Sequence, residues 1–362
     1  MSEAKIASSP PPFYYQIKEK TTQPLVMVSE KKIVEEVSGW LRVFDDGSVD
    51  RSWTGPKEVE FLATPVAPSE QFIDGVATRD VVIDPKSGLS VRIYLPEEEH
   101  DKDAKLPILL HFHGGGFCIS RASWYMYYQF YARLVKSARA ICVSVEMRLA
   151  PDHRLPAAVD DCYDALVWLR TLARGDLTEP WLRAYADFSR VFLIGDSSGG
   201  NLVHEVAARA GSQEWAPLQL AGGVPIHPGF VRSKRSQSEF NTEFETPFLT
   251  LKMVDTFLGL ALPTGSTKDH PITCPMGPAA PPLSKLKLPP FLMVVAERDL
   301  IQDTELEYMA EMKKAGKEIE VAYNKGVGHS FYLNKIAVES DPVTATETDL
   351  LISTISDFVK RH

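Results

Sequence analysis

The chain has 362 residues, of which 44% are hydrophobic and 24% charged, with a net charge of -9 and a pI near 5.6. This composition is typical of a globular protein, and the acidic balance argues against nucleic acid as a partner, because phosphates attract basic surfaces. No apolar stretch approaches the ~18 residues that a membrane span needs. The four cysteines, Cys118, Cys142, Cys162 and Cys274, form no C-x-x-C pair, so we expect free thiols, no metal site and a cytoplasmic location.

The N-terminal part of the chain is expected to be a leader followed by a cap. Residues 1–28 are polar and rich in proline, which predicts a flexible leader, and they lack the apolar stretch of a secretory signal. Residues 29–75 are expected to form a cap segment. Apolar residues recur at helical spacing from Ile33 to Leu41, which predicts an amphipathic helix capped by Ser29. A hairpin turn is expected at Asp46-Gly47.

Residues 76–362 are expected to form one α/β core. Two alternating runs, 80–84 and 89–95, predict an antiparallel hairpin across the turn at 85–88. Apolar runs then alternate with helical stretches, which indicates a mainly parallel sheet covered by helices on both faces. The predicted strands are 107–112, 140–147, 191–194, 222–226, 291–296 and 319–323, and the predicted helices lie near 122–136, 157–172, 199–211, 250–260, 304–315 and 347–361.

A long insertion at residues 231–288 interrupts this alternation. Insertions between the strands of such a sheet commonly sit over the strand ends, where ligands bind. We therefore expect the insertion to complete the cap together with the N-terminal helix.

The motif Gly195-Asp-Ser-Ser-Gly199 joins a predicted buried strand directly to a predicted helix. A turn this tight pushes the side chain of Ser197 out of the sheet, so G-x-S-x-G in this context is typical of a nucleophile elbow. A serine alcohol is a poor nucleophile at neutral pH. The site therefore needs a base, an acid that orients the base, and hydrogen-bond donors for an oxyanion.

The run His113-Gly-Gly-Gly-Phe117 follows the strand predicted at 107–112. Its glycines leave room for a carbonyl oxygen, and their backbone N–H groups, with the N–H of Ser198, are candidate oxyanion donors. His113 precedes the elbow, so we expect it to orient the loop rather than to act as the base.

The expected acid is Asp299, because it lies just past the strand at 291–296 and can reach over the sheet. Glu297 and Asp303 remain alternatives, although Asp303 is expected to cap the helix that follows. Glu305 and Glu307 lie within that helix and are expected to face solvent.

The expected base is His329, in the loop after the strand at 319–323. The chain order serine, acid, histidine leaves His329 and His362 as candidates, and His362 lies at the chain end. His227 follows another strand and is a candidate either for the pocket or, more in keeping with its position, for a structural role.

These motifs, with Arg148-Leu-Ala-Pro-Asp-His-Arg-Leu-Pro156 and Asp299-Leu-Ile-Gln-Asp303, resemble the hormone-sensitive-lipase-like group of α/β-hydrolases, and the plant carboxylesterases in particular. Segments 35–51 and 326–335 look most like the hypersensitivity-related carboxylesterases of plants. Small departures are Met147, where tyrosine is common, and Asp152, where glutamate is usual. The resemblance runs from about residue 30 to the end of the chain. It implies the α/β-hydrolase fold, no cofactor, and a site made of Ser197 as nucleophile, Asp299 as acid, His329 as base, and Gly115, Gly116 and Ser198 as oxyanion donors.

The sequence therefore predicts a serine carboxylesterase that hydrolyses a small or medium-sized ester through an acyl-enzyme. Candidate pocket residues near the motifs are Phe117, Tyr125, His227, Phe230, Phe248 and Phe331. One alternative is a ligand-binding protein like the gibberellin receptors, which resemble this group but lack the catalytic histidine. Another is a lyase or cyclase of plant specialised metabolism. The presence of both Ser197 and His329 favours hydrolysis.

Overall fold

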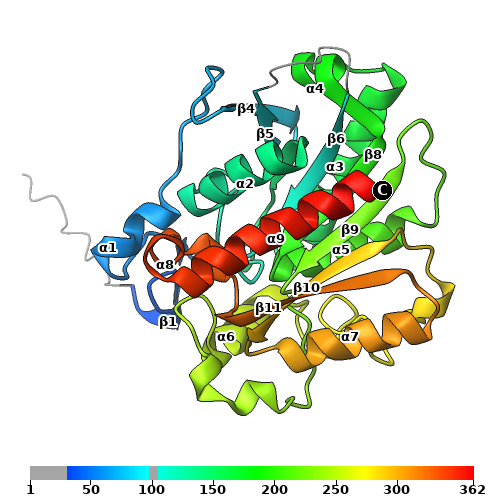
Figure 1. Ribbon diagram of the computed structural model, residues 1–362. Coiled ribbons are helices and arrows are strands. Elements are labelled where there is room, and N and C mark those ends of the chain that lie inside the picture. The colour runs from blue at the N-terminus through cyan, green and yellow to red at the C-terminus, as the bar shows by residue number, and fades with distance from the viewer. Residues whose placement is uncertain (1–30, 98–104) are drawn as a thin grey trace, which may run out of the picture.

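The computed structural model describes residues 31–97 and 105–362. The predicted leader, residues 1–28, and the predicted helix cap Ser29 lie outside the described residues. Within them, a central sheet carries helices on both faces, and a smaller sheet formed by the N-terminal segment lies beside it (Figure 1).

The central sheet has eight strands. In chain order they are β4 (Val76–Asp84), β5 (Leu89–Pro96), β6 (Leu106–Phe112), β7 (Ile141–Glu146), β8 (Ala186–Asp196), β9 (Leu220–Ile226), β10 (Phe291–Arg298) and β11 (Ile319–Gly328). Their order across the sheet is β11-β10-β9-β8-β6-β7-β5-β4. β5 pairs antiparallel with both of its neighbours and the other neighbouring pairs are parallel, so the predicted hairpin and the mainly parallel sheet are both confirmed.

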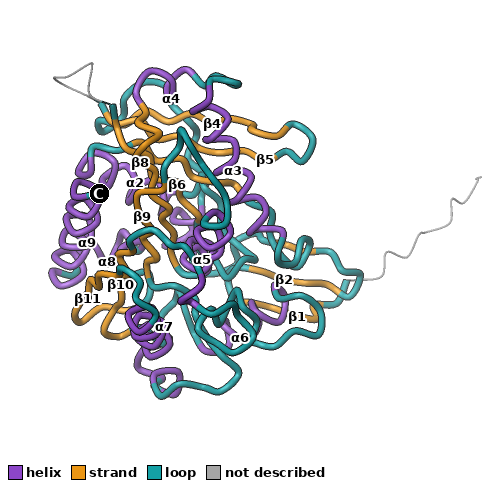
Figure 2. Tube along the Cα trace, turned by 90° about the vertical axis from the view of Figure 1, so that its right-hand side faces the viewer, coloured by secondary structure: helices purple, strands orange, loops and turns teal. Residues whose placement is uncertain are grey.

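Helices cover the sheet because its central strands are apolar on both faces and must be shielded from water. The longer helices are α2 (Tyr125–Ala138), α3 (Ala157–Arg174), α5 (Ser198–Ala210), α6 (Leu251–Ala261), α7 (Gln302–Lys314) and α9 (Pro342–Arg361). The short ones are α1 (Lys57–Glu60), α4 (Pro180–Tyr185) and α8 (Lys335–Ser340), with 3-10 turns at Phe61–Ala63, Ser238–Phe240, Thr242–Phe244, Leu283–Lys285 and Phe331–Leu333. α2 and α9 pack together on one face, and α3 and α5 pack together on the other (Figure 2).

The N-terminal segment is a small antiparallel sheet, so the helix predicted from Ile33 to Leu41 was wrong. Its strands are β1 (Ile33–Val37), β2 (Leu41–Phe44) and β3 (Val49–Asp50). The chain turns between β1 and β2 at Gly39, whose φ of 81° suits glycine, and the Trp40 N–H donates to the Val37 carbonyl at 2.9 Å. The β-branched residues of β1 favour a strand, and the apolar spacing that suggested a helix instead spans two strands and their turn. The turn predicted at Asp46-Gly47 is confirmed.

Arg51 ties this small sheet to the central fold. Its guanidinium donates to the carbonyl oxygens of Cys118 and Ala150, at 2.7 and 2.8 Å, and to the carboxylate of Asp152 at 2.6 Å. Asp152, a departure from the usual pattern of the resembling family, therefore has a partner. The N-terminal sheet also meets the insertion that holds α6, because β1 contacts α6.

No helix within the described ranges has both the length and the apolar character needed to cross a membrane.

Candidate functional site

Ser197 lies at the sharp turn between β8 and α5, where the elbow motif predicts it. Its φ of 51° and ψ of -124° are strained for a residue with a side chain, and such strain is typical of functional turns. Backbone hydrogen bonds hold the turn: the Ser197 N–H donates to Ile226 at 2.9 Å, and the Ser197 carbonyl accepts from Gly200 and Gly229 at 2.8 and 2.9 Å. The turn therefore fixes the direction of the hydroxyl before any ligand arrives.

The glycines of the elbow are required by close packing. A Cβ atom at position 199 would lie 2.0 Å from the carbonyl oxygen of Phe112 at the end of β6. A Cβ atom at position 195 would lie 2.5 Å from the carbonyl oxygen of Gly199. Strand and helix thus pass so closely that a side chain at either position would push them apart.

Asp299 and His329 follow the neighbouring strands β10 and β11 and form a buried hydrogen-bonded pair. The Nδ1 atom of His329 lies 2.7 Å from Oδ2 of Asp299, and the Ile301 N–H donates to Oδ1 at 3.1 Å. Burial acts to raise the pKa of Asp299, but the charge and hydrogen bond of His329 outweigh it, and the pKa lies below its usual value. Asp299 is therefore ionised at neutral pH and accepts a hydrogen bond from the Nδ1–H group of the imidazole.

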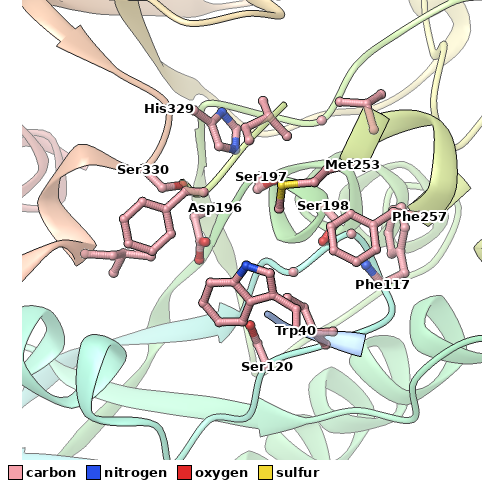
Figure 3. Close-up of a pocket in the computed structure, with 18 of the residues that line it drawn as sticks. Trp40, Phe117, Ser120, Asp196, Ser197, Ser198, Met253, Phe257, His329 and Ser330 are labelled. Atoms are coloured by element: carbon pink, nitrogen blue, oxygen red, sulfur yellow. Dashed lines mark hydrogen bonds between the residues drawn. The ribbon is translucent and has the colours of Figure 1, made fainter. Parts of the chain in front are cut away.

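The second ring nitrogen of His329 is left for other chemistry. His329 is 2% exposed, and its Nε2 atom has no hydrogen-bond partner within the described part of the chain. His329 and Ser197 line the same cavity, where their side chains face a common space (Figure 3). With Nδ1 protonated, Nε2 carries a lone pair that can accept a proton from an alcohol in this cavity.

The alternatives for acid and base lie elsewhere. Glu297 accepts a hydrogen bond from the Gly326 N–H at 2.7 Å on the surface. Asp303 does not cap α7 as predicted, because its carboxylate accepts from the Ser238 N–H of the insertion at 2.7 Å. His362 lies 3.8 Å from the carboxylate of Glu320, near the start of β11. Of these candidates, His329 lines the cavity with Ser197, and Asp299 reaches the site through its hydrogen bond to His329.

The glycine run lies against the elbow and lines the same cavity. Gly115 and Gly116 have φ angles of 105° and 60°, so their backbone conformations suit glycine. Neither N–H group donates to another described residue. The next N–H, of Phe117, donates to Oγ of Ser198 at 3.2 Å, which joins the run to the start of α5. The sequence-predicted donors Gly115, Gly116 and Ser198 therefore all border the space beside Ser197.

Tyr127 is a site residue that the sequence reasoning missed. Its hydroxyl accepts from the Gly114 N–H at 3.1 Å and donates to Oδ2 of Asp196, the residue before Ser197, at 3.4 Å. The side chain from α2 thereby connects the glycine run with the elbow. Its position within an apolar helical stretch gave no signal of this role, because a tyrosine there is usually part of the core.

Glu305 is buried, although the sequence predicted that it faces solvent. It is 0% exposed, and neither carboxyl oxygen has a hydrogen-bond partner among the residues described. Burial and the charge of Asp299 raise its pKa well above the usual value. Burial therefore favours the protonated form of this carboxyl group.

His113 and His227 are both buried and have structural contacts. The Nδ1–H of His113 donates to the Gly114 carbonyl at 2.9 Å, which holds the glycine run as expected. Nδ1 of His227 accepts from the Ser330 N–H at 3.1 Å, next to His329. Burial lowers the pKa of each ring to about 4, so both are neutral at pH 7.

Among the described residues, His227, Asp299 and His329 also form a group whose ligand atoms lie within 4.8 Å of one another, close enough to hold a metal ion. Protein N–H groups already bind part of this donor set, although Nε2 of His329 keeps its lone pair. The Ser330 N–H binds Nδ1 of His227, and the Ile301 N–H and the His329 ring bind the two carboxylate oxygens of Asp299. The donor set therefore fits a hydrogen-bonded network better than a metal centre.

Two of the six predicted pocket residues line the cavity at Ser197: Phe117 and Phe248. The other four lie outside its lining. Tyr125 of α2 packs against Phe61, and Phe230 is fully buried against Tyr308. His227 packs against His329, and Phe331 packs against His227. Further apolar wall residues include Trp40 of the N-terminal segment and Met253 and Phe257 of α6 (Figure 3).

A family model described as the alpha/beta hydrolase fold matches residues 109–333, which is more than half of the chain. This protein belongs to the α/β-hydrolase family. The resemblance to hormone-sensitive-lipase-like hydrolases, expected from the motifs, is thereby confirmed.

The α/β-hydrolase is similar to curated plant proteins with different names. It is 36% identical to probable carboxylesterase 6 of Arabidopsis thaliana, over 86% of this chain and 88% of the relative. It is 35% identical to tuliposide A-converting enzyme 1 of Tulipa gesneriana, over 86% and 76%. It is 34% identical to the gibberellin receptor GID1C of Arabidopsis thaliana, over 88% and 91%.

Solved structures share the fold of this α/β-hydrolase. An esterase of Pyrobaculum calidifontis matches with a TM-score of 0.63 at 27% identity, over 78% of this chain and 84% of that one. Carboxyl esterase 2 of Tuber melanosporum has a TM-score of 0.63 at 22% identity, over 81% of this chain and 90% of that one. At this identity the match supports the fold alone.

Proposed function

We propose that this α/β-hydrolase is a serine carboxylesterase that cleaves a small or medium-sized ester through an acyl-enzyme. One observation carries the proposal: Nε2 of His329 is unpaired and opens on the cavity of Ser197, while Nδ1 is bound to the ionised Asp299. This arrangement supplies a base of fixed tautomer beside a serine that the backbone holds in a strained turn.

The proposed reaction has two steps. Ser197 attacks the ester carbonyl as Nε2 of His329 takes the hydroxyl proton, and the N–H groups of Gly115, Gly116 and Ser198 receive the oxyanion. The imidazolium then protonates the leaving alcohol. Water hydrolyses the acyl-enzyme with His329 again as base, which returns Ser197 to its alcohol form.

The test is hydrolysis of p-nitrophenyl acetate by Ser197→Ala. We expect kcat to fall by about 10⁴-fold or more, because the nucleophile is lost while the fold remains. Ser212→Ala, an exposed serine just beyond the end of α5, is the matched control and should behave as the parent. An organophosphate should label the parent at Ser197 and leave Ser197→Ala unlabelled. Undiminished turnover by Ser197→Ala would refute the assignment.

A second candidate is ligand binding without turnover, favoured by the 34% identity to a gibberellin receptor. The unpaired Nε2 of His329 argues for chemistry instead. The tulip relatives are named as tuliposide A-converting enzymes, so the reaction products of this protein should be identified as well as its rate measured. Mass spectrometry separates the three outcomes: acid and alcohol products indicate hydrolysis, other products a lyase or cyclase, and unchanged bound ligand a receptor.

We also propose that the protein works in the cytosol. Its four cysteines are free and buried, which suits a reducing compartment. Microscopy of a fluorescent fusion of the full chain tests this location.

A further inference from the structure

Two cavities lie side by side under the cap. The inner cavity, which contains Ser197 and His329, has a volume of about 70 Å³. The outer cavity, between the N-terminal segment and the insertion, has a volume of about 450 Å³. A volume near 70 Å³ holds only a few water-sized groups, whereas 450 Å³ lies in the range of sites for drug-sized ligands.

The two cavities share one wall. Trp40, Phe248 and Met253 line both, and Trp40 and Met253 are drawn on the Ser197 side in Figure 3. The ring centroids of Trp40 and Phe248 lie 6.5 Å apart. Met253 is unbranched and flexible, so a change of its rotamer is the least costly way to connect the two spaces.

The outer cavity is built for an apolar group. Its walls include Trp53, which meets Trp40 edge-on at 4.6 Å between ring centroids, and Val59 and Leu62 of the N-terminal segment. The charged residues of its lining, Glu36 and Lys252, are both exposed. The lining also carries neutral polar side chains, such as Thr250, Thr256 and Asn334. Because it holds no buried charge, its aromatic and aliphatic walls favour hydrocarbon over ionic ligands.

We propose that the outer cavity binds a large apolar group on one side of the ester carbonyl, while the inner cavity holds the short group on the other side. The substrate class is thus an asymmetric ester, with a short and a long hydrocarbon part. This inference rests on the proposed esterase function, and it specifies which esters the site prefers. Burial of the long part in the outer cavity would stabilise the complex by removing apolar surface from water.

The first test compares long and short esters in the full chain. Val59→Trp fills the outer cavity from α1, and Glu58→Trp, on the exposed side of the same helix, is the matched control. Two ester pairs separate the sides of the carbonyl: p-nitrophenyl octanoate against acetate, and octyl acetate against ethyl acetate.

We expect Val59→Trp to lower the ratio of kcat/KM for the long ester over the short one by about tenfold or more, in one of the two pairs. The pair that responds tells whether the acyl or the alcohol part enters the outer cavity. Glu58→Trp should leave both ratios unchanged. Equal ratios in the parent and Val59→Trp for both pairs would overturn the proposal.

A second readout does not depend on hydrolysis. The uncharged fluorescent probe N-phenyl-1-naphthylamine should bind the parent, Ser197→Ala and Glu58→Trp alike, and bind Val59→Trp at least about tenfold more weakly. Inactive protein with this binding pattern would refute the esterase function and keep the outer cavity as a binding site. Equal binding by all four proteins would overturn the outer cavity as an apolar site, whatever the activity.

Discussion

At the scale of single residues, the site depends on which atoms are paired and which are left unpaired. Asp299 is fully buried, yet it stays ionised because the His329 ring and the Ile301 N–H both donate to it. Burial and the charge of Asp299 raise the pKa of Glu305 well above its usual value. The consequence is one imidazole nitrogen fixed as a donor to Asp299 and the other free to accept a proton in the cavity.

Replacing the acid tests this account. Asp299→Asn keeps the shape of the side chain but removes the charge and favours the wrong tautomer of His329, so we expect kcat for p-nitrophenyl acetate to fall by about 10⁴-fold. The control is Asp303→Asn, whose carboxylate contacts Ser238 and not His329. Near-parental turnover by a folded Asp299→Asn protein would exclude Asp299 as the acid.

At the scale of elements, the site is assembled where the carboxyl ends of parallel strands meet. β6 ends before the glycine run, β8 before Ser197, β10 before Asp299 and β11 before His329. Adjacent strands in a parallel sheet end at the same edge, so residues far apart in the chain become neighbours there. The close contact of α5 with β6 sets how tightly the elbow can turn.

Glycine substitutions in two helices test the importance of that contact. Gly199→Ala would place a Cβ atom against the Phe112 carbonyl, so we expect the free energy of unfolding to fall by about 2 kcal/mol or more, with loss of activity. Gly259→Ala in α6 meets nothing within 4 Å and should raise stability by about 0.5–1 kcal/mol. Urea unfolding measures both changes. A Gly199→Ala protein as stable as the parent would contradict the close packing.

At the scale of the whole molecule, one partly buried acid couples stability to pH. Burial raises the pKa of Glu205, on α5, from 4.5 to about 7 in the folded protein. Between these values the folded protein holds a proton that the unfolded chain has already lost. The contribution of Glu205 to stability therefore falls as pH rises from about 4.5 to about 7 and stays unfavourable above that.

Removing this acid should stabilise the protein in alkaline solution. Glu205→Gln is neutral at every pH, so we expect it to exceed the parent in free energy of unfolding by about 2 kcal/mol at pH 8 and to match it at pH 4.5. Glu214→Gln, an exposed residue shortly after the same helix, is the control and should track the parent. Urea unfolding at the two pH values gives the comparison. If Glu205→Gln changed the free energy of unfolding equally at both pH values, the raised pKa of Glu205 would be contradicted.

Local patterns in the sequence determined the core of this fold. The alternation of apolar runs and helical stretches predicted the central sheet, because burial on both faces of a strand leaves a continuous apolar run that needs no knowledge of distant residues. The elbow at Ser197 and the positions of Asp299 and His329 past their strands follow from the same local order. Their proposed roles come from motif and resemblance.

Only the tertiary structure decided the form of the N-terminal segment and the lining of the pocket. The apolar spacing from Ile33 to Leu41 fits either a helix or two strands joined by a turn. In the structure the segment forms the two strands, and β1 packs against α6 of the insertion. Phe117 and Phe248 reach the cavity while Phe230 and Phe331 do not, because the wall depends on how Trp40 and α6, more than two hundred residues apart in the chain, meet in space. Periodicity carries information about a residue's own element, and a cavity is made between elements.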